Sequence, residues 1–367
     1  MIKMERKYGL DILKIMATII IVFHHYQQIT GTVFEGINFY GGKFYFGYVV
    51  ELFFVISGYV IYPYVNKISE KSLRLSEFYL NRFIRLFPMV SISAIGYELF
   101  LYIYVCRMGH EFFREWCPTL WGTVLNSLMM QCGWGFTNPE VNNPTWYISV
   151  LMLCYVLFYV LVSIARKYKF DVIYLFGVMV LLGVAINTYS LQLPLLNDDT
   201  YRGFYSFFWG LILRRLMPIV QEKIMKHKFF AVFVGIITIV IIPLLIYKEH
   251  VIVSSDINYL VTFIYYTVII CLLEMIQTNC ILKCLFLKTL SEISFNVYLW
   301  HITLLIVMYI IIWNFFEGQT WFLCLRITMY LFTIASFICG SISYYFIEKP
   351  IVSQIEKRSK ARQTMIK

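Results

Sequence analysis

The sequence of 367 residues is 60% hydrophobic and only 14% charged, with a mean hydropathy of +0.71. Soluble domains contain about 25% charged residues, so this composition excludes a soluble protein and predicts an all-α, polytopic membrane protein. The net charge of +10 does not indicate a nucleic-acid partner, because the basic residues gather in alternate loops between apolar stretches. We therefore expect a lipid bilayer as the main partner of the chain.

Apolar stretches predict about ten membrane-spanning helices. Their expected ranges are 10–30, 45–64, 87–105, 146–164, 172–190, 204–217, 229–247, 257–276, 290–313 and 320–346. Twenty-five of the 31 Lys and Arg residues fall on the side that holds the N-terminus, which predicts that both termini lie in the cytoplasm. We expect a transmembrane domain over 1–348 and a basic cytoplasmic tail over 349–367.

One predicted outer loop, 106–145, is much longer than the others. Its middle, 119–130, is apolar enough to lie in the outer interface, and loops of this length are often functional. The nine cysteines are scattered singly without metal-site spacing, so no metal is expected. Three cysteines share the loop, and the sequence leaves open whether a disulfide forms among them: Cys106, Cys117 and Cys132.

The first apolar helix contains ionisable residues, which are costly at bilayer depth and usually mark a site. Lys14 and His25 are eleven residues apart. At ~100° per residue their side chains point in the same direction, ~16 Å apart along the helix axis. Asp11 and Thr18 lie within ~40° of the same line, whereas His24 is rotated by ~100°. The helix therefore carries a polar stripe from the membrane edge to well past its middle.

His25 is a candidate general base. It is expected ~22 Å from the inner end of its helix, in the outer half of the bilayer. Glu51, near the start of the second span, lies at a comparable depth. A carboxylate bonded to one imidazole nitrogen would fix the tautomer and leave the other nitrogen as a base at neutral pH. The alternative is a structural His–Glu pair that only fastens two helices.

Arg82 and Arg85 lie in FYLNRFIRLFP, residues 78–88, at the inner end of the third span. Their spacing places both guanidinium groups on one face of a helix, where together they can bind phosphate groups bidentately. The alternative is an anchor on anionic lipid.

Two further ionisable residues are expected near the membrane midplane, Glu98 in the third span and His301 in the ninth. We expect Glu98 to pair within the helix bundle. His301 follows Tyr298 and Trp300, and its residue type suits either core hydrogen bonding or catalysis.

Six segments follow one another along the chain: LDILKIMATIIIVFHH (10–25), VVELFFVISGYVI (49–61), FYLNRFIRLFP (78–88), TWYISVLMLCYVLFY (145–159), ISFNVYLWH (293–301) and YYFIEKP (344–350). In this order they resemble acyltransferase family 3, bacterial multi-pass membrane enzymes that O-acylate sugars of cell-surface polysaccharides and related acceptors. The first segment has the family's basic residue, ten intervening residues and histidine, as Lys14 and His25. The third has its RxxR element, as Arg82 and Arg85.

The resemblance implies that acetyl-CoA or another acyl-CoA is a co-substrate, with no bound cofactor. Its phosphates would dock on Arg82 and Arg85 from the cytoplasm, and Lys14 would contact the donor. His25 would act as general base or become acylated itself. The acceptor would be a polysaccharide or lipid-linked glycan at the bacterial inner membrane. A transporter or flippase for an acyl group or a polyprenyl-linked sugar is the alternative class, and the sequence does not indicate an oligomeric state.

The sequence departs from the family pattern at one place. Many members carry acidic residues shortly after the tryptophan equivalent to Trp146, where this sequence has Leu151 and Met152. The difference implies a branch with another acceptor or donor arrangement. Some members are fused to an extracytoplasmic esterase-like domain that hands the acyl group on. No such domain is expected here, which implies direct transfer to the acceptor.

Overall fold

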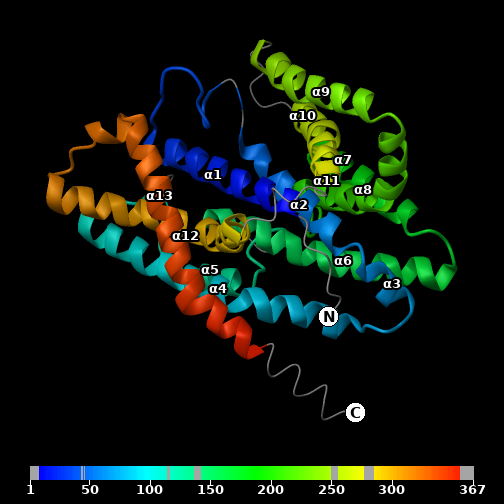
Figure 1. Cartoon of the computed structure of the whole chain (residues 1–367). Coiled ribbons are helices and arrows are strands. Elements are labelled where there is room, and N and C mark those ends of the chain that lie inside the picture. Colours follow the sequence, from blue (N-terminus) through cyan, green and yellow to red (C-terminus); the bar gives the residue numbers. More distant parts are fainter. Residues whose placement is uncertain are drawn as a thin grey trace. The chain divides into compact units, whose positions relative to one another are not determined.

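The structure is a computed structural model that describes residues 8–42, 44, 46–113, 116–135, 142–248, 255–276 and 285–355. Within these ranges the regular elements are all helical, and Figure 1 follows them from α1 in blue to α13 in red. The chain divides into two compact units, of which the first comprises 1–73 and 154–291 and the second 74–153 and 292–367.

Among the described residues, eight α-helices lie wholly within the first unit. They are α1 (Tyr8–Thr30), α2 (Val49–Ile61), α3 (Tyr64–Ser69), α7 (Ile173–Thr188), α8 (Thr200–Lys226), α9 (Lys228–Lys248), α10 (Ser255–Leu260) and α11 (Tyr266–Ile276). A π-helical turn, Val261–Tyr265, joins α10 to α11. The core of this unit forms where α1, α2, α8 and α11 meet, around side chains such as Leu13, Val55 and Ile270.

The second unit contains α4 (Leu75–Met108), α5 (Leu120–Ser127) and α13 (Arg326–Ser343), while α6 (Trp146–Tyr168) and α12 (Leu285–Phe316) cross the boundary between the units. After α13 a π-helical turn, Tyr344–Glu348, leads into a helix that continues to Ile355. The predicted tail from 349 onward therefore starts within a helix, and its residues 356–367 lie outside the described part of the chain.

Six helical segments among the described residues are long and apolar enough to cross a membrane: Tyr8–Thr30, Leu75–Met108, Asn143–Tyr168, Ile257–Glu274, Phe286–Phe316 and Arg326–Ile355. Three further predicted spans coincide with shorter apolar helices, Phe46–Ile61, Ile173–Thr188 and Val232–Leu244. The predicted span 204–217 lies inside α8. The all-α, multi-pass class is confirmed, whereas the number of about ten spans stays a prediction.

Helices α2 and α8 pack very closely because each has a glycine at the contact. A Cβ atom at Gly58 would overlap the backbone carbonyl of Phe207, and one at Gly210 would overlap that of Val55. Small residues at such contacts are typical of membrane helices, whose association depends on close packing rather than on a hydrophobic driving force. The two glycines therefore set the distance between α2 and α8.

Replacing the first of these glycines should separate the two helices. We expect Gly58→Ala to reduce the free energy of unfolding by about 1–3 kcal/mol, because the added methyl group overpacks a backbone contact. Gly177→Ala on α7 is the matched control, since no atom lies within 4 Å of a Cβ there. Thermal unfolding in detergent would measure both variants, and equal midpoints would contradict the packing described here.

Candidate functional site

Helix α1 is unbroken from Tyr8 to Thr30, so Lys14 and His25 lie on one continuous helix. His25 is buried, with 8% of its surface exposed, and Lys14 is half-buried. Near the other end of α1, the hydroxyl group of Ser291 donates to the buried carboxylate of Asp11 at 2.7 Å. The residues of the predicted polar stripe therefore lie along one continuous helix, most of whose residues are buried.

The segment after α1 folds back onto the C-terminal end of this helix, and Gln27 holds it there. The side-chain oxygen of Gln27 accepts from the Phe39 amide at 2.6 Å, and its amide donates to Asn38 Oδ1 at 2.7 Å and to the Thr32 carbonyl at 3.1 Å. Asn38 in turn bonds to both backbone groups of Phe34. Sequence analysis missed Gln27, although a wholly buried glutamine in an apolar helix is a usable signal.

His24 connects this segment to His25. Its Nδ1 lies 2.8 Å from the carbonyl oxygen of Phe39. Because a carbonyl oxygen can only accept, Nδ1 carries the proton, and Nε2 is the acceptor of the neutral ring. The rings of His24 and His25 meet edge to face with centroids 5.3 Å apart, and Tyr40 packs against His24 at the same distance. His24 is therefore a positioning residue for the ring beside it.

Glu51 is completely buried, and its carboxylate is bound by Arg202 of α8. Nε and Nη2 of Arg202 donate to the two carboxylate oxygens at 2.5 and 2.8 Å. Tyr205 and Asn258 donate to Oε1 at 3.1 and 3.2 Å. A bidentate pair with further hydrogen bonds is the arrangement in which the charges of a buried ion pair compensate the cost of leaving water.

These contacts give Glu51 a different partner from the one predicted. The hypothesis that Glu51 orients His25 stays a prediction, while both carboxylate oxygens accept from Arg202. Arg202 Nη2 also donates to the Gly47 carbonyl at 2.8 Å, just before α2. Arg202 is 151 positions from Glu51 along the chain. No local motif indicated this pairing.

The two arginines of the RxxR element lie on one face of α4. Nη1 of Arg82 donates to the Phe78 carbonyl at 2.7 Å, and the guanidinium carbon lies 3.7 Å from the centroid of the buried Phe78 ring. Arg82 is thereby held in one orientation, while Arg85 is exposed. Helix α4 starts at Leu75, before the predicted span 87–105, and continues through Pro88, which membrane helices tolerate.

His301 lies on α12 and is completely buried. Its Nδ1 is 2.8 Å from the Tyr298 carbonyl oxygen, one helical turn earlier, so Nδ1 is again the protonated nitrogen. The hydroxyl group of Tyr298 donates to the Pro144 carbonyl. These contacts support a core hydrogen-bonding role for His301, while a catalytic role stays a prediction.

Part of the long 106–145 segment is fastened to helices of the second unit. The amide group of Asn142 donates to the Leu299 carbonyl of α12 at 3.0 Å. Thr145 donates to Asn126 of α5 at 3.0 Å and accepts from Gln131 at 2.9 Å. The predicted apolar middle of this segment forms the short helix α5, and residues 114, 115 and 136–141 lie outside the described part of the chain.

Glu98 is bound within the second unit, as expected, but to a backbone group. Its Oε2 accepts from the Thr119 amide at 2.8 Å, at the start of α5. Glu98 therefore ties α4 to the 106–145 segment and needs no catalytic role to explain its position.

These features define a multi-pass membrane protein that buries ionisable side chains within its helices, which is typical of a membrane enzyme or transporter. A family model described as an acyltransferase domain matches residues 7–346, and the chain belongs to this family, acyltransferase family 3. Comparisons with curated proteins and with solved structures found no match. The protein is therefore a membrane acyltransferase, and the family resemblance of its six segments is confirmed.

Removing the charge of Glu51 should destabilise the first unit, because Arg202, whose side chain is only 19% exposed, would lose its countercharge. We expect Glu51→Gln to cost about 3–5 kcal/mol of unfolding free energy. Glu222→Gln is the matched control, since the Glu222–Lys226 pair is 66–70% exposed and worth only about 0.3–0.5 kcal/mol. Unfolding in detergent would measure both, and a Glu51→Gln variant as stable as the control would exclude a stabilising role for the pair.

Proposed function

We propose that the protein is an O-acyltransferase, with acetyl as the acyl group, that uses acyl-CoA from the cytoplasm. The acceptor is a hydroxyl group of a cell-surface polysaccharide or a lipid-linked sugar. Membership of the acyltransferase family supports the reaction class. The residue assignment rests on the burial of His25 in a continuous apolar helix. The ring of the adjacent His24 is anchored to the Phe39 carbonyl.

The proposal includes a direction across the membrane. We assign about ten spans with both termini in the cytoplasm of a bacterial inner membrane, with a transmembrane domain over 1–348 and a basic tail over 349–367. The excess of basic residues on one set of loops supports this orientation. It places Lys14 near the cytoplasm and His25 in the outer half of the bilayer, so that the acyl group travels outward.

Donor binding is assigned to Lys14, Arg82 and Arg85. The Arg82 guanidinium group is oriented by its bond to the Phe78 carbonyl and by stacking on the Phe78 ring, and the exposed Arg85 adds a second cation on the same helix face. Arginine pairs bind phosphate groups more specifically than lysines do, because the guanidinium group is planar and bidentate. Acyl-CoA enters as a co-substrate rather than a resident cofactor.

His25 is assigned the proton transfer. A ring nitrogen of His25 takes the proton from the acceptor hydroxyl group, whose oxygen attacks the thioester carbonyl carbon. The C–S bond then breaks, and the CoA thiolate leaves and is protonated. In the second form of this chemistry an imidazole nitrogen of His25 attacks the thioester carbonyl carbon, the C–S bond breaks and the CoA thiolate leaves. The acceptor oxygen then attacks the acyl-imidazole carbon and displaces the imidazole.

Release of free CoA separates acyl transfer from transport, because a transporter or flippase moves its cargo without cleaving the thioester. Purified protein would be incubated with acetyl-CoA and an envelope glycan fraction, and thiol formation would be followed with a thiol reagent. We expect thiol release that depends on both protein and glycan. Transport of the glycan or acyl group without thiol release would favour the transporter instead.

The two adjacent histidines should differ in their effect on this reaction. We expect His25→Ala to reduce acyl transfer by at least about 10²-fold, because it removes the general base. His24→Ala should retain measurable activity, since we assign the proton transfer to His25 and His24 bonds to the Phe39 carbonyl and packs against the His25 ring. Turnover measured on both variants at equal folded protein would test the assignment. Retained activity in His25→Ala would exclude it.

Arg82→Ala should weaken acyl-CoA binding by about 10- to 10²-fold, because it removes an oriented, charge-assisted phosphate contact worth roughly 1.5–3 kcal/mol. Arg74→Ala is the matched control, since Arg74 is an exposed arginine before the first turn of the same helix. Isothermal titration in detergent would give both affinities. If the two variants bound equally well, the RxxR arginines would be assigned to lipid anchoring.

A further inference from the structure

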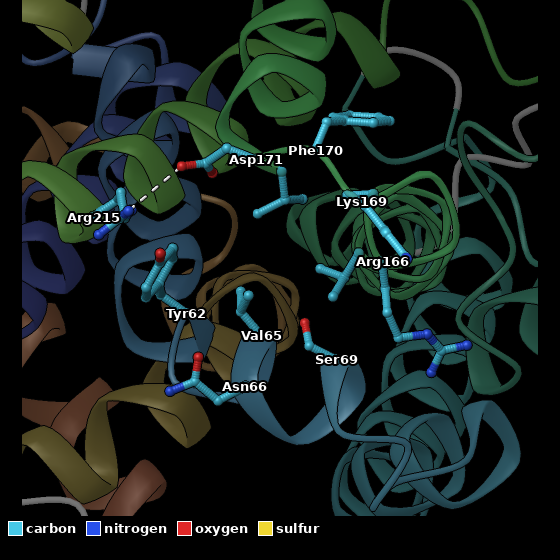
Figure 2. A pocket seen from close by; sticks show the side chains of 12 residues that line it. Tyr62, Val65, Asn66, Ser69, Arg166, Lys169, Phe170, Asp171 and Arg215 are labelled. Carbon is cyan, nitrogen blue, oxygen red and sulfur yellow. Dashed lines mark hydrogen bonds and ion pairs between the residues drawn. The ribbon is translucent and has the colours of Figure 1, made fainter.

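An open cavity of about 370 Å³ lies in the first unit and is lined by none of the site residues assigned above (Figure 2). Its walls come from α3, the end of α6, the α6–α7 connection and α8. Four buried side chains make its apolar surface: Val65, Val162, Ala165 and Val172. Polar side chains surround this surface, including those of Asn66 and Ser69 of α3.

The cavity is lined by more basic than acidic side chains. Arg166, Lys169 and Arg215 face a single acidic residue, Asp171. Figure 2 shows Arg215 and Asp171 together at one side and Arg166 and Lys169 at the other. The Arg215–Asp171 pair is 3.4 Å long, and its side chains are 51% and 43% exposed, so it is weak and open to competition by another anion.

The other two cations remain available to a ligand. Nη1 of Arg166 donates to the Ile68 carbonyl at 3.0 Å, which fixes the guanidinium group and leaves its other N–H donors for further partners. Lys169 is exposed, and the part of the chain that the structure describes gives it no acidic partner. An oriented guanidinium group beside an ammonium group is a favourable arrangement for phosphate oxygens.

The backbone of Lys169 gives an independent reason to ask what its side chain does. Lys169 ends α6 with φ of +57°, a left-handed conformation in which glycine is preferred. The Lys169 amide bonds to the Arg166 carbonyl and the Phe170 amide to the Ala165 carbonyl, which is the usual glycine-type helix end. The helix end itself therefore favours glycine at this position and does not by itself require the lysine side chain.

We propose that this cavity binds a phosphate ester, with the phosphate oxygens on Arg166 and Lys169 and the organic part against the apolar surface. A phosphomonoester carries about −1.5 to −2 charges at pH 7, which matches the excess positive charge of the cavity. The ester comes either from a soluble nucleotide or from a phospholipid headgroup, because both present the same phosphate chemistry. Binding here does not depend on acyl transfer, so the two assignments can fail separately.

Labelling of lysines with an amine-reactive acetylating reagent, read by mass spectrometry, tests the site in the full-length protein. Lys71 is the internal control, because it is also exposed, also has a left-handed backbone with φ of +58°, and does not line the cavity. One arm adds adenosine 3′,5′-bisphosphate to delipidated protein in detergent. The other compares nanodiscs of phosphatidylcholine with nanodiscs that also contain phosphatidic acid.

We expect labelling of Lys169 to fall at least threefold in one arm, while labelling of Lys71 stays unchanged. Protection by the bisphosphate identifies a soluble ester, and protection only by phosphatidic acid identifies a lipid headgroup. Unchanged labelling of Lys169 in both arms, or equal protection of both lysines, overturns the assignment.

Two glycine variants provide a second test that does not depend on labelling. Lys169→Gly removes the ammonium group at a position where glycine suits the backbone, so folding should be preserved. Lys71→Gly makes the same change outside the cavity. We expect the affinity for the protecting probe to fall about tenfold in Lys169→Gly only. Equal affinities of the two variants contradict binding at this cavity.

Discussion

The buried ion pair between Glu51 and Arg202 is the interaction on which the first unit depends most. An isolated charge inside a helical membrane protein is costly, so neither residue would be stable in this position without the other. The same two helices, α2 and α8, also meet backbone to backbone at Gly58 and Gly210. Arg202 also binds the Gly47 carbonyl, so the same interaction fixes the chain where it enters α2.

The segment between α1 and α2 is consequently held at both ends. At one end Arg202 binds Gly47, and at the other Gln27 and His24 bind the backbone of Phe39. A loop anchored in this way limits the rotation of the His24 ring, which packs against His25. For a general base, a fixed ring orientation matters as much as basicity, because proton transfer needs hydrogen-bond geometry. The orientation of the His25 ring on α1 therefore also depends on contacts made by the segment that leads into α2.

Sequence patterns predicted the features that depend on neighbouring residues. The helical class, the continuous α1 with Lys14 and His25, and the shared face of Arg82 and Arg85 all follow from local periodicity, and the family was recognisable from ordered motifs. Helix α4 begins at Leu75, twelve residues before the predicted apolar span 87–105, because hydropathy marks the apolar part of a helix and not its polar extension. The partner of Glu51 was not predictable, since Arg202 lies on another helix far along the chain.

The cavity near Lys169 belongs to the same class of missed features. Its basic residues were visible in the sequence as part of the positive-inside pattern, which every multi-pass membrane protein shows. Only the fold brings Arg166, Lys169 and Arg215 to one opening with a single acidic residue. The distribution of Lys and Arg along the sequence therefore predicts how the chain is oriented in the membrane. A binding site can be predicted only when the fold shows which charged side chains lie together and which of them already form pairs.

The most direct test of the central claim, that His25 transfers an acyl group to a surface glycan, is mass spectrometry of envelope glycans from cells with and without the protein. The deletion strain would be complemented with the native chain, with the His25→Ala variant or with the His24→Ala variant, at equal membrane levels. The account predicts acyl groups on the glycan with the native chain, their absence with His25→Ala and partial recovery with His24→Ala. Full acylation in cells that contain only the His25→Ala variant would contradict it.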